Sequence, residues 1–314
     1  MSKKVLIVGG CGYIGGFLTD HLTKNGYNVT VYDNLLFESR FMKPCSFIFG
    51  DIRDHEKLNS IINNYDVVVW LAGLVGDGAC AVNPELTKEL NVDSVKWLVD
   101  NFKGKIVFPS TCSVYGVNND LISEDAPPNP LSLYAATKLE AEEYVLKKRP
   151  DSLVFRLGTL FGVGDLHSRL RLDLVANILS MKAAMCKPLT VFGGEQWRPL
   201  LHVRDVSTAI LHGLENDTEG LYNLSYKNFI ISDLTKEIQK VIPECTVSYT
   251  KMKFEDLRNY KVTNQKMLDT GWEPCYNIEV GIRQVSQLIL DSRVKNVEDL
   301  VYSNAAYMRK LYEF

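Results

Sequence analysis

Tyr134 and Lys138 stand four residues apart in the stretch Tyr134-Ala-Ala-Thr-Lys138, a spacing that puts both side chains on one face of a helix. Such a helix delivers a phenol and an ammonium group to one place. A phenol in water loses its proton near pH 10, so a tyrosine that acts as a base at neutral pH needs its pKa lowered by roughly three units. A nearby positive charge shielded from water favours that shift. The pair is therefore a candidate general base, although the same spacing also suits a packed helix face.

A run of glycines follows the first predicted strand directly. The segment Gly9-Gly10-Cys11-Gly12-Tyr13-Ile14-Gly15 comes after the strand 5–8 and opens a predicted helix, which is the setting that a dinucleotide-binding loop requires. The missing side chains allow a tight turn, and they let backbone N–H groups and the helix N-terminus approach a pyrophosphate. The residues expected to contact the dinucleotide are Gly9, Gly12, Tyr13, Ile14 and Gly15.

An acidic residue at the end of the second predicted strand indicates which dinucleotide binds. Asp33 lies 18 residues after Gly15, where its carboxylate can accept a hydrogen bond from the 2′-hydroxyl of the adenosine ribose. The same carboxylate would repel a 2′-phosphate, so the sequence predicts NAD rather than NADP. Asn34, next to it, is a further candidate contact. The alternative is a glycine turn with an unrelated surface aspartate.

Two later strand ends are also candidate cofactor contacts. Asp51 and Ile52 follow the third predicted strand, where they could contact adenine. Leu71, Ala72 and Gly73 end the fourth strand, and small residues there let the chain pass close to the cofactor. From spacing alone, each could equally be an ordinary strand end.

Short runs rich in β-branched residues alternate with longer amphipathic segments through the first half of the chain, a pattern typical of βα units around a parallel sheet. Continuous apolar runs such as Val67-Val68-Val69-Trp70 suit strands covered on both faces. The predicted fold class is therefore α/β, a Rossmann-like doubly wound parallel sheet. The predicted strands are 5–8, 28–32, 46–49, 66–71, 105–108 and 152–155, and the predicted helices lie near 13–25, 54–64, 85–102 and 132–148.

The second half of the chain is less regular. It has a polar segment with arginines at 163–173, a predicted helix near 173–186, a strand and turn over 188–197, and a helix over 203–215. We expect a smaller mixed α/β lobe that binds substrate, with the chain crossing back between lobes. The predicted division is an NAD-binding domain of residues 1–160 plus about 198–225, a substrate lobe of about 161–197 and 226–285, and a C-terminal helical tail of 286–314.

Composition and charge exclude several classes of function. The 314 residues are 46% apolar and 23% charged, close to the average of a globular protein with a full core. The formal net charge of −3 gives no electrostatic reason to expect nucleic acid or an anionic membrane as a partner. Charges and glycines interrupt every apolar run well before about 18 residues, so no membrane span is predicted.

The seven cysteines are scattered and contain no Cys-x-x-Cys pair, which argues against a disulfide framework or a structural zinc site. The five histidines also lack ligand-like spacing, so no metal is predicted. The first residues superficially resemble a signal peptide, but glycines break the apolar segment, and we interpret it as the first strand. A reducing compartment, the cytoplasm, is expected.

Nearly the whole chain resembles the extended short-chain dehydrogenase/reductase family, specifically its sugar-nucleotide epimerase/dehydratase branch. The resemblance rests on the glycine loop, Asp33, Tyr134 and Lys138, and on Thr111-Cys112-Ser113-Val114-Tyr115-Gly116, which is similar to the family's Ser/Thr-x-x-x-Tyr-Gly strand end. Asn91 matches a recurrent asparagine on the helix after the fourth strand and is expected at the cofactor. The resemblance implies NAD as cofactor and a nucleotide-diphosphate sugar as substrate.

The resemblance also implies the roles of three catalytic residues. Tyr134, as phenolate, would remove the proton from a sugar hydroxyl while hydride passes from the same carbon to the nicotinamide. Lys138 would hold the phenolate and the nicotinamide ribose, and Thr111 would hydrogen-bond the reacting oxygen. Cys112 and Ser113 are candidate substrate contacts, although nothing in the sequence makes Cys112 a thiolate, and its side chain is interpreted as packing.

Arginine suits a pyrophosphate because its planar fork binds two oxygens at once. The segments that contain Arg198-Pro199 and Arg258-Asn259-Tyr260 resemble the family's sugar-nucleotide contacts, which implies that Arg198 and Arg258 bind substrate. Arg169 and Arg171 are further candidates. For each arginine the alternative is a solvated surface residue. The remaining expected substrate contacts are Thr159 and Asn177.

Four residues depart from the family pattern. The 4,6-dehydratases of this branch carry Asp-Glu after the active-site threonine, whereas this chain has Cys112-Ser113, which cannot replace a carboxylate acid/base pair. Dehydration is therefore not expected. Thr159 stands where many epimerases have an asparagine near the sugar phosphates, and Val75 where some have a lysine. These changes leave substrate details and the outcome of the reaction open.

The expected reaction is oxidation of the C4 hydroxyl of a nucleotide-linked sugar to a 4-keto sugar. The chain looks most like bacterial enzymes that oxidise C4 of a GDP-linked heptose for capsule synthesis. A 4-epimerase, which returns the hydride to the other face, shares every catalytic residue. A non-catalytic NAD-binding scaffold or redox sensor is the alternative of another class, although such proteins typically lack the tyrosine or the lysine. The helices near 85–102 and 132–148 imply a homodimer, by resemblance.

Overall fold

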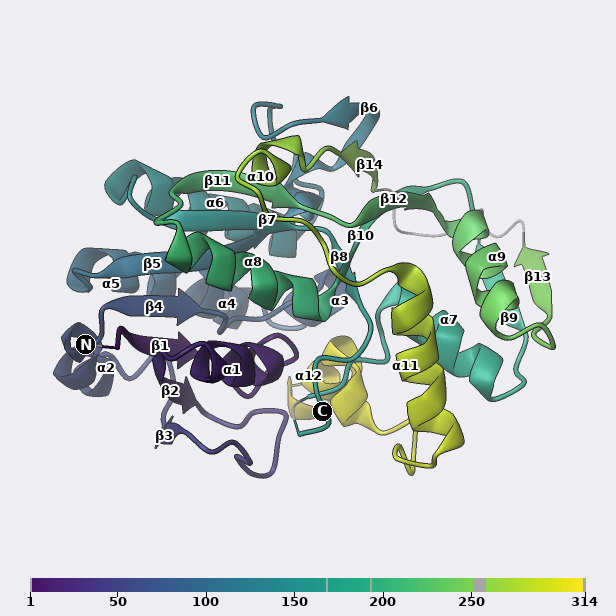
Figure 1. Ribbon diagram of the computed structural model, residues 1–314, viewed down its shortest axis with the longest axis horizontal. Coiled ribbons are helices and arrows are strands. Elements are labelled where there is room, and N and C mark those ends of the chain that lie inside the picture. The colour runs from purple at the N-terminus through teal and green to yellow at the C-terminus, as the bar shows by residue number, and fades with distance from the viewer. Residues whose placement is uncertain (1, 168, 193, 251–257, 313–314) are drawn as a thin grey trace.

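A seven-stranded sheet forms the centre of the molecule in the computed structural model, which describes residues 2–167, 169–192, 194–250 and 258–312 (Figure 1). The strand order is β11-β7-β5-β4-β1-β2-β3, and every neighbouring pair is parallel. This arrangement confirms the predicted Rossmann-like sheet. Its strands are β1 (Lys4–Val8), β2 (Asn28–Asp33), β3 (Ser46–Phe49), β4 (Val67–Trp70), β5 (Lys105–Thr111), β7 (Leu153–Leu157) and β11 (Gly220–Leu224).

Alternate side chains of each central strand enter two separate cores, because successive residues of a strand point to opposite faces. On β1, Val5 and Ile7 pack into the core that contains α1 (Gly15–Lys24) and α8 (Val203–Glu215). Leu6 and Val8 pack into the core on the other face, with α5 (Ser94–Asn101) and α6 (Leu133–Lys148). Burial on both faces explains why these strands are continuously apolar.

The predicted helix near 85–102 is interrupted. It consists of α4 (Pro84–Lys88), the π-helical segment η2 (Glu89–Asp93) and then α5. The side chain of Asn83 caps the N-terminus of α4 by accepting from the Leu86 N–H. The π-helical turn contains Asn91, whose side chain bonds the chain after β4, and π-helical turns are common at functional sites. The other predicted helix and strand centres in this half agree with the structure.

A smaller mixed α/β lobe lies beside the seven-stranded sheet, to its right in Figure 1. Its core is built mainly from the helices α7 (Val175–Ala184), α9 (Ile231–Val241) and α11 (Ile278–Leu290), which pack on a three-stranded sheet. That sheet has the order β12-β10-β8. The remaining strands of the described chain are β8 (Thr159–Phe161), β10 (Trp197–His202), β12 (Lys227–Ile230), β9 (Leu189–Phe192) with β13 (Val247–Thr250), and β6 (Val117–Ile122) with β14 (Asn259–Val262).

The C-terminal region returns to the nucleotide-binding part of the molecule. After α10 (Gln265–Leu268) and α11, the helix α12 (Asn304–Tyr312) packs against the short helix α3 (Asp77–Cys80), which follows β4. α2 (His55–Ile61) completes the helices of the described chain. Within that part of the chain, no helix is long and apolar enough to span a bilayer, and no group of three or more His, Cys, Asp or Glu side chains could hold a metal ion.

A buried ion pair joins α6, the helix of Tyr134 and Lys138, to the sheet. Arg156 on β7 donates to Glu142 on α6 with an N–O distance of 2.6 Å, and both side chains are at least 95% buried. The Arg156 guanidinium also donates to the Tyr115 hydroxyl. Each charge is compensated, so the pair fixes the position of α6 against β7 without leaving an unpaired group.

Removal of one charge should therefore be costly. We expect Glu142→Gln to lower the free energy of unfolding by about 3 to 5 kcal/mol, because Arg156 would keep a buried charge without a counterion. Urea denaturation measures the difference. Glu140→Gln is the control on the same helix: Glu140 pairs with Lys96 but is half exposed, and such a pair contributes less than about 1 kcal/mol. Equal losses in the two variants would contradict this assignment.

Candidate active site

The glycine loop lies so close to the end of β4 that side chains would not fit. Gly9 has a φ of +83°, and a Cβ atom there would lie 2.6 Å from the backbone nitrogen of Ala72. A Cβ at Gly15 would meet the backbone of Gly10. The loop therefore brings backbone N–H groups and the start of α1 to the carboxyl edge of the sheet. This cradle fits the diphosphate of a dinucleotide.

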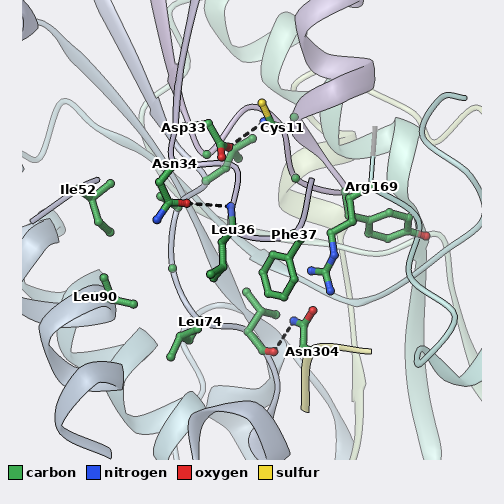
Figure 2. Close-up of a pocket in the computed structure, with 18 of the residues that line it drawn as sticks. Cys11, Asp33, Asn34, Leu36, Phe37, Ile52, Leu74, Leu90, Arg169 and Asn304 are labelled. Carbon is green, nitrogen blue, oxygen red and sulfur yellow. Dashed lines mark hydrogen bonds between the residues drawn. The ribbon is translucent and has the colours of Figure 1, made fainter. Parts of the chain in front are cut away.

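A deep pocket lies at this edge of the sheet, between the glycine loop, the segments after β2, β3 and β4, and the C-terminal helix (Figure 2). The sequence predictions for the cofactor therefore converge on one cavity, and contact of each residue with the cofactor remains a proposal. The predicted residues that line it are Gly9, Gly12, Tyr13, Ile14, Gly15, Asp33, Asn34, Asp51, Ile52, Leu71, Ala72 and Gly73.

Backbone N–H groups fix the carboxylate of Asp33 at the mouth of the glycine loop. It accepts from the Cys11 N–H at 2.9 Å and from the Leu35 N–H at 2.7 Å. Burial raises the pKa of this carboxyl, and the backbone hydrogen bonds oppose that rise. Asn34 donates to Asp51, so the ends of β2 and β3 are joined beside the pocket.

Asn91, like Tyr134 and Lys138, is a predicted cofactor residue that does not line the pocket. Its side chain is buried, accepts from the Leu74 N–H at 2.8 Å and donates to the Leu74 carbonyl at 2.9 Å. Gly73 is needed beside it, because a Cβ there would lie 2.7 Å from the Asn91 side-chain oxygen. Asn91 therefore holds the chain after β4 in shape, and that chain lines the pocket.

Tyr134 and Thr111 meet next to the pocket. Tyr134 is the second residue of α6, which begins after Ser132, whose hydroxyl accepts from the Ala135 N–H. The buried phenol of Tyr134 lies near enough to the side chain of Thr111, at the end of β5, for Thr111 to influence its pKa. Tyr134 also packs with Leu74 and Ala79, and both of these residues line the dinucleotide pocket.

Burial dominates the electrostatics of the pair Tyr134 and Lys138. It raises the pKa of the Tyr134 phenol, and the side chain of Thr111 opposes this rise. Burial likewise lowers the pKa of Lys138 to about 7, and the carboxylate of Glu142 opposes that shift. The Lys138 ammonium lies 3.9 Å from the centre of the Phe108 ring. The lowering of the phenol pKa expected from the sequence is therefore not present in the protein without ligand.

Two predicted substrate residues lie together beside α3. Arg258 donates to the Ser113 hydroxyl at 3.1 Å, and its guanidinium lies 3.3 Å from the carboxylate of Asp77. Asp77 in turn accepts from Ser132, the capping residue of α6, at 2.7 Å. The Arg258 side chain is a quarter exposed. An arginine fork thus lies near the N-terminus of the helix of Tyr134, where it could receive a diphosphate.

Other predicted substrate residues have protein partners. Arg198 donates to the carbonyls of Trp197 and Arg258, and it is buried. The Cys112 thiol is fully buried and donates to the Arg156 carbonyl, and burial raises its pKa. Cys112 therefore points into the core, in line with its interpretation as packing.

The remaining predicted substrate residues lie on separate segments and also have protein partners. Asn177 accepts from the Gly162 N–H and donates to the Arg171 carbonyl and to the Tyr13 hydroxyl. Thr159 begins β8 and pairs with Leu200 of β10. Arg171 forms a two-point ion pair with Asp173 but also lines the dinucleotide pocket, as does Arg169. The two arginines therefore lie at the cofactor side of the site.

Sequence reasoning missed an entire wall of the pocket. Residues of the loop after β2 and of the C-terminal helix line it, and none of them belongs to a motif. These residues include Leu36, Phe37, Asn304, Met308 and Tyr312. The only indication in the sequence was indirect: the C-terminal tail was expected to be helical, but no packing partner was predicted for it.

Comparison with known proteins agrees with this geometry. Residues 5–225 match the model of the NAD dependent epimerase/dehydratase family. The UDP-glucose 4-epimerase of Streptomyces lividans is 29% identical over 278 residues, which cover 78% of this chain and 84% of that protein. The UDP-glucose 4-epimerase of Rhizobium meliloti is 26% identical over 315 residues, with coverages of 88% and 94%.

The fold is also that of solved structures in this group. UDP-glucuronic acid 4-epimerase from Bacillus cereus, in complex with UDP-glucuronic acid and NAD, superposes with a TM-score of 0.80. The match has 23% sequence identity and covers 92% of this chain and 99% of that one. The chain therefore belongs to the NAD dependent epimerase/dehydratase family, and it is an NAD-dependent enzyme of the extended short-chain dehydrogenase/reductase type.

Proposed function

We propose that this enzyme oxidises the C4 hydroxyl of a nucleotide-linked sugar, with Tyr134 as the base. The observation that carries the proposal is the position of the buried Tyr134 phenol beside the Thr111 side chain, packed with Leu74 and Ala79, which line the dinucleotide pocket. A sugar hydroxyl that bonds both side chains would have its carbon beside the nicotinamide end of the pocket. Hydride and proton can then leave the same C–O–H group.

The proton of the C4 hydroxyl group and the hydride of C4 have different acceptors. The Tyr134 phenolate would accept the hydroxyl proton, and bound NAD would supply the acceptor for the hydride of C4. Thr111 holds the reacting oxygen. Because burial alone disfavours the phenolate, Tyr134 needs additional positive charge nearby, and Lys138 lies one helical turn away. With a pKa of about 7, Lys138 can give or take a proton near neutral pH.

The substrate is proposed to be a nucleotide-diphosphate sugar. Arg258 and Ser113 support this, because an arginine fork suits a diphosphate and a hydroxyl suits a sugar. Relatives described as UDP-glucose 4-epimerases favour a UDP-sugar and an epimerisation, in which the hydride returns to the other face of the 4-keto sugar. Net oxidation of a GDP-heptose for capsule or surface polysaccharide is the candidate that the sequence resemblance supports.

The homodimer and the cytoplasm also belong to the proposal. The expected dimer would pair α5 and α6 with their counterparts in a second copy. In the structure the buried faces of both helices pack against the sheet. The outer side of α6 carries Glu140, which pairs with Lys96, and Tyr144, which donates a hydrogen bond to Asp100. Sedimentation of the purified protein measures whether it is a monomer or a dimer.

Tyr134→Phe should reduce turnover by about 10²- to 10⁴-fold, the usual contribution of a general base, while NAD stays bound. Turnover is followed with a panel of UDP-, GDP-, dTDP- and CDP-sugars, and NAD binding by calorimetry. Tyr144→Phe is the matched control on α6, since its hydroxyl bonds Asp100 on the outer side. Undiminished turnover in Tyr134→Phe would refute its role as the base.

The same sugar panel separates the two reaction outcomes. Mass spectrometry of the recovered sugar nucleotide should show an unchanged mass with altered chromatography if the enzyme is an epimerase. Loss of two hydrogens with formation of NADH would instead identify a net dehydrogenase. No conversion of any sugar in the panel would count against both outcomes and favour a scaffold or sensor.

Lys138→Met should stabilise the protein without ligand in a pH-dependent manner. The pKa of Lys138 is about 7 in the folded protein, whereas an ordinary lysine has 10.5. Between these values the unfolded chain binds more protons, so the stability of the wild type rises with pH. The penalty of burying the charge is complete below about pH 7 and vanishes above about pH 10.5.

The variant should therefore unfold at a higher temperature than the wild type at about pH 6, and the difference should shrink toward about pH 10. Thermal unfolding across this range measures it. Lys148→Met, at the exposed C-terminal end of α6, should show no such trend. Parallel pH profiles of wild type and Lys138→Met would show that Lys138 is charged at neutral pH in the folded protein.

A further inference from the structure

The C-terminal segment, defined as residues 299–312, forms the outer wall of the dinucleotide pocket. Asn304, Met308 and Tyr312 of α12 line the same cavity as the glycine loop and Asp33. Asn304 and Met308 are at least 95% buried. The start of α12 is tied to the segment after β4, because the Asn304 side chain donates to the Val75 carbonyl at 2.6 Å (Figure 2).

The polar segment 163–173 holds the C-terminal segment from the other side. The Leu172 N–H donates to the Tyr302 carbonyl at 3.1 Å, and the Asn304 N–H donates to the Asp173 carboxylate at 3.0 Å. The Arg169 guanidinium donates through Nε and Nη2 to the Val301 carbonyl, at 3.2 and 3.0 Å. Arg169 is thereby fixed at the junction of both segments.

Arg169 is a buried cation that forms no ion pair within the described part of the chain, although the carboxylates of Asp173 and Glu38 attract it from a longer distance. Its side chain lines the pocket, its guanidinium lies 3.4 Å from the centre of the Phe37 ring, and the residue is 6% exposed. Within the described ranges, no carboxylate lies at ion-pair distance from it, and Nη1 makes no hydrogen bond. Asp173 pairs instead with Arg171. Burial and the neighbouring Arg171 lower the pKa of Arg169 to about 9.

Burial of the Arg169 guanidinium without a paired carboxylate is unfavourable. A buried charge costs several kcal/mol unless an opposite charge compensates it. A carbonyl and an aromatic ring satisfy part of the guanidinium but do not neutralise it. The pocket therefore presents a positive charge and a free N–H edge, which an anionic ligand would complete.

A second buried group points to the same conclusion. The side-chain oxygen of Asn304 is buried and has no hydrogen-bond partner among the described residues. Its amide nitrogen is already used for Val75, so the orientation of this oxygen is fixed. A buried acceptor without a donor is unfavourable, and a ligand hydroxyl or amide in the pocket would satisfy it.

We propose that Arg169 binds the diphosphate of the dinucleotide, and that the C-terminal segment holds it there and closes the pocket over the cofactor. The dinucleotide is favoured over the sugar nucleotide because Arg169 shares its cavity with the glycine loop and packs on Phe37, which follows Asp33 by four residues. Among the described residues that line this cavity, neither Ser113 nor Arg258 occurs.

The test is Arg169→Gln in the full-length protein freed of nucleotide. Calorimetry with NAD and with ADP-ribose, which keeps the diphosphate but lacks nicotinamide, should show affinities about 10- to 100-fold weaker than in the wild type. Arg169→Lys keeps the charge but not the fork, so its affinities for NAD and ADP-ribose should lie between those of the wild type and those of Arg169→Gln. Arg283→Gln is the control, since Arg283 pairs with Glu279 on the exposed side of α11 and should leave both affinities unchanged.

Thermal unfolding separates binding from a bracing role. Without ligand, Arg169→Gln should unfold at the same temperature as the wild type or higher, because a charge without a counterion has been removed. Saturating ADP-ribose should then raise its unfolding temperature less than it raises that of the wild type.

Two results would overturn the proposal. A lower unfolding temperature without ligand, combined with unchanged ADP-ribose affinity, would make Arg169 a brace for Val301. Unchanged NAD and ADP-ribose affinities with weakened binding of UDP would assign it to the substrate. Because none of these measurements uses a nucleotide-diphosphate sugar or turnover, they stand apart from the proposed reaction.

Discussion

The close approach of two backbones sets the geometry of this enzyme. Gly9 lies against Ala72 so tightly that a methyl group would not fit, and this contact joins the ends of β1 and β4 at one edge of the sheet. The start of α1 then faces the gap where a diphosphate binds. Asp33, the chain after β4 and Tyr134 take their positions relative to that edge, so cofactor recognition and chemistry depend on a few absent side chains.

Burial of charged side chains is the second constraint on this structure, and it has two different outcomes. Glu142 and Arg156 compensate each other, so they can fix α6 on the sheet. Lys138 and Arg169 have no such partner among the described residues, and burial lowers the pKa of each. The compensated charge serves the fold, whereas Arg169 lines the proposed dinucleotide pocket and Lys138 lies on the helix of the proposed base.

The sequence predicted the nucleotide-binding half well because local signals there are redundant. Apolar strands buried on both faces, a glycine turn that tolerates no substitute, and the Tyr134 and Lys138 spacing all report on neighbouring residues. The smaller lobe was predicted only in outline, since its short strands pair across long separations, as β6 does with β14. The contact between Arg169 and Val301 could not be predicted from sequence, because nothing in their local spacing encodes a contact across more than a hundred residues.

The position of α12 has a consequence for how the molecule matures. One wall of the nucleotide pocket comes from residues 9–15 and another from residues 304–312, so two segments far apart in the sequence must meet before the cavity is complete. The strands β1, β2 and β4 lie within the first part of the sequence and can pair early in folding, whereas the last wall is added only when α12 docks. Joining such distant segments is slow, because the intervening chain must be ordered first. A complete nucleotide pocket is thus among the last features of the fold to form.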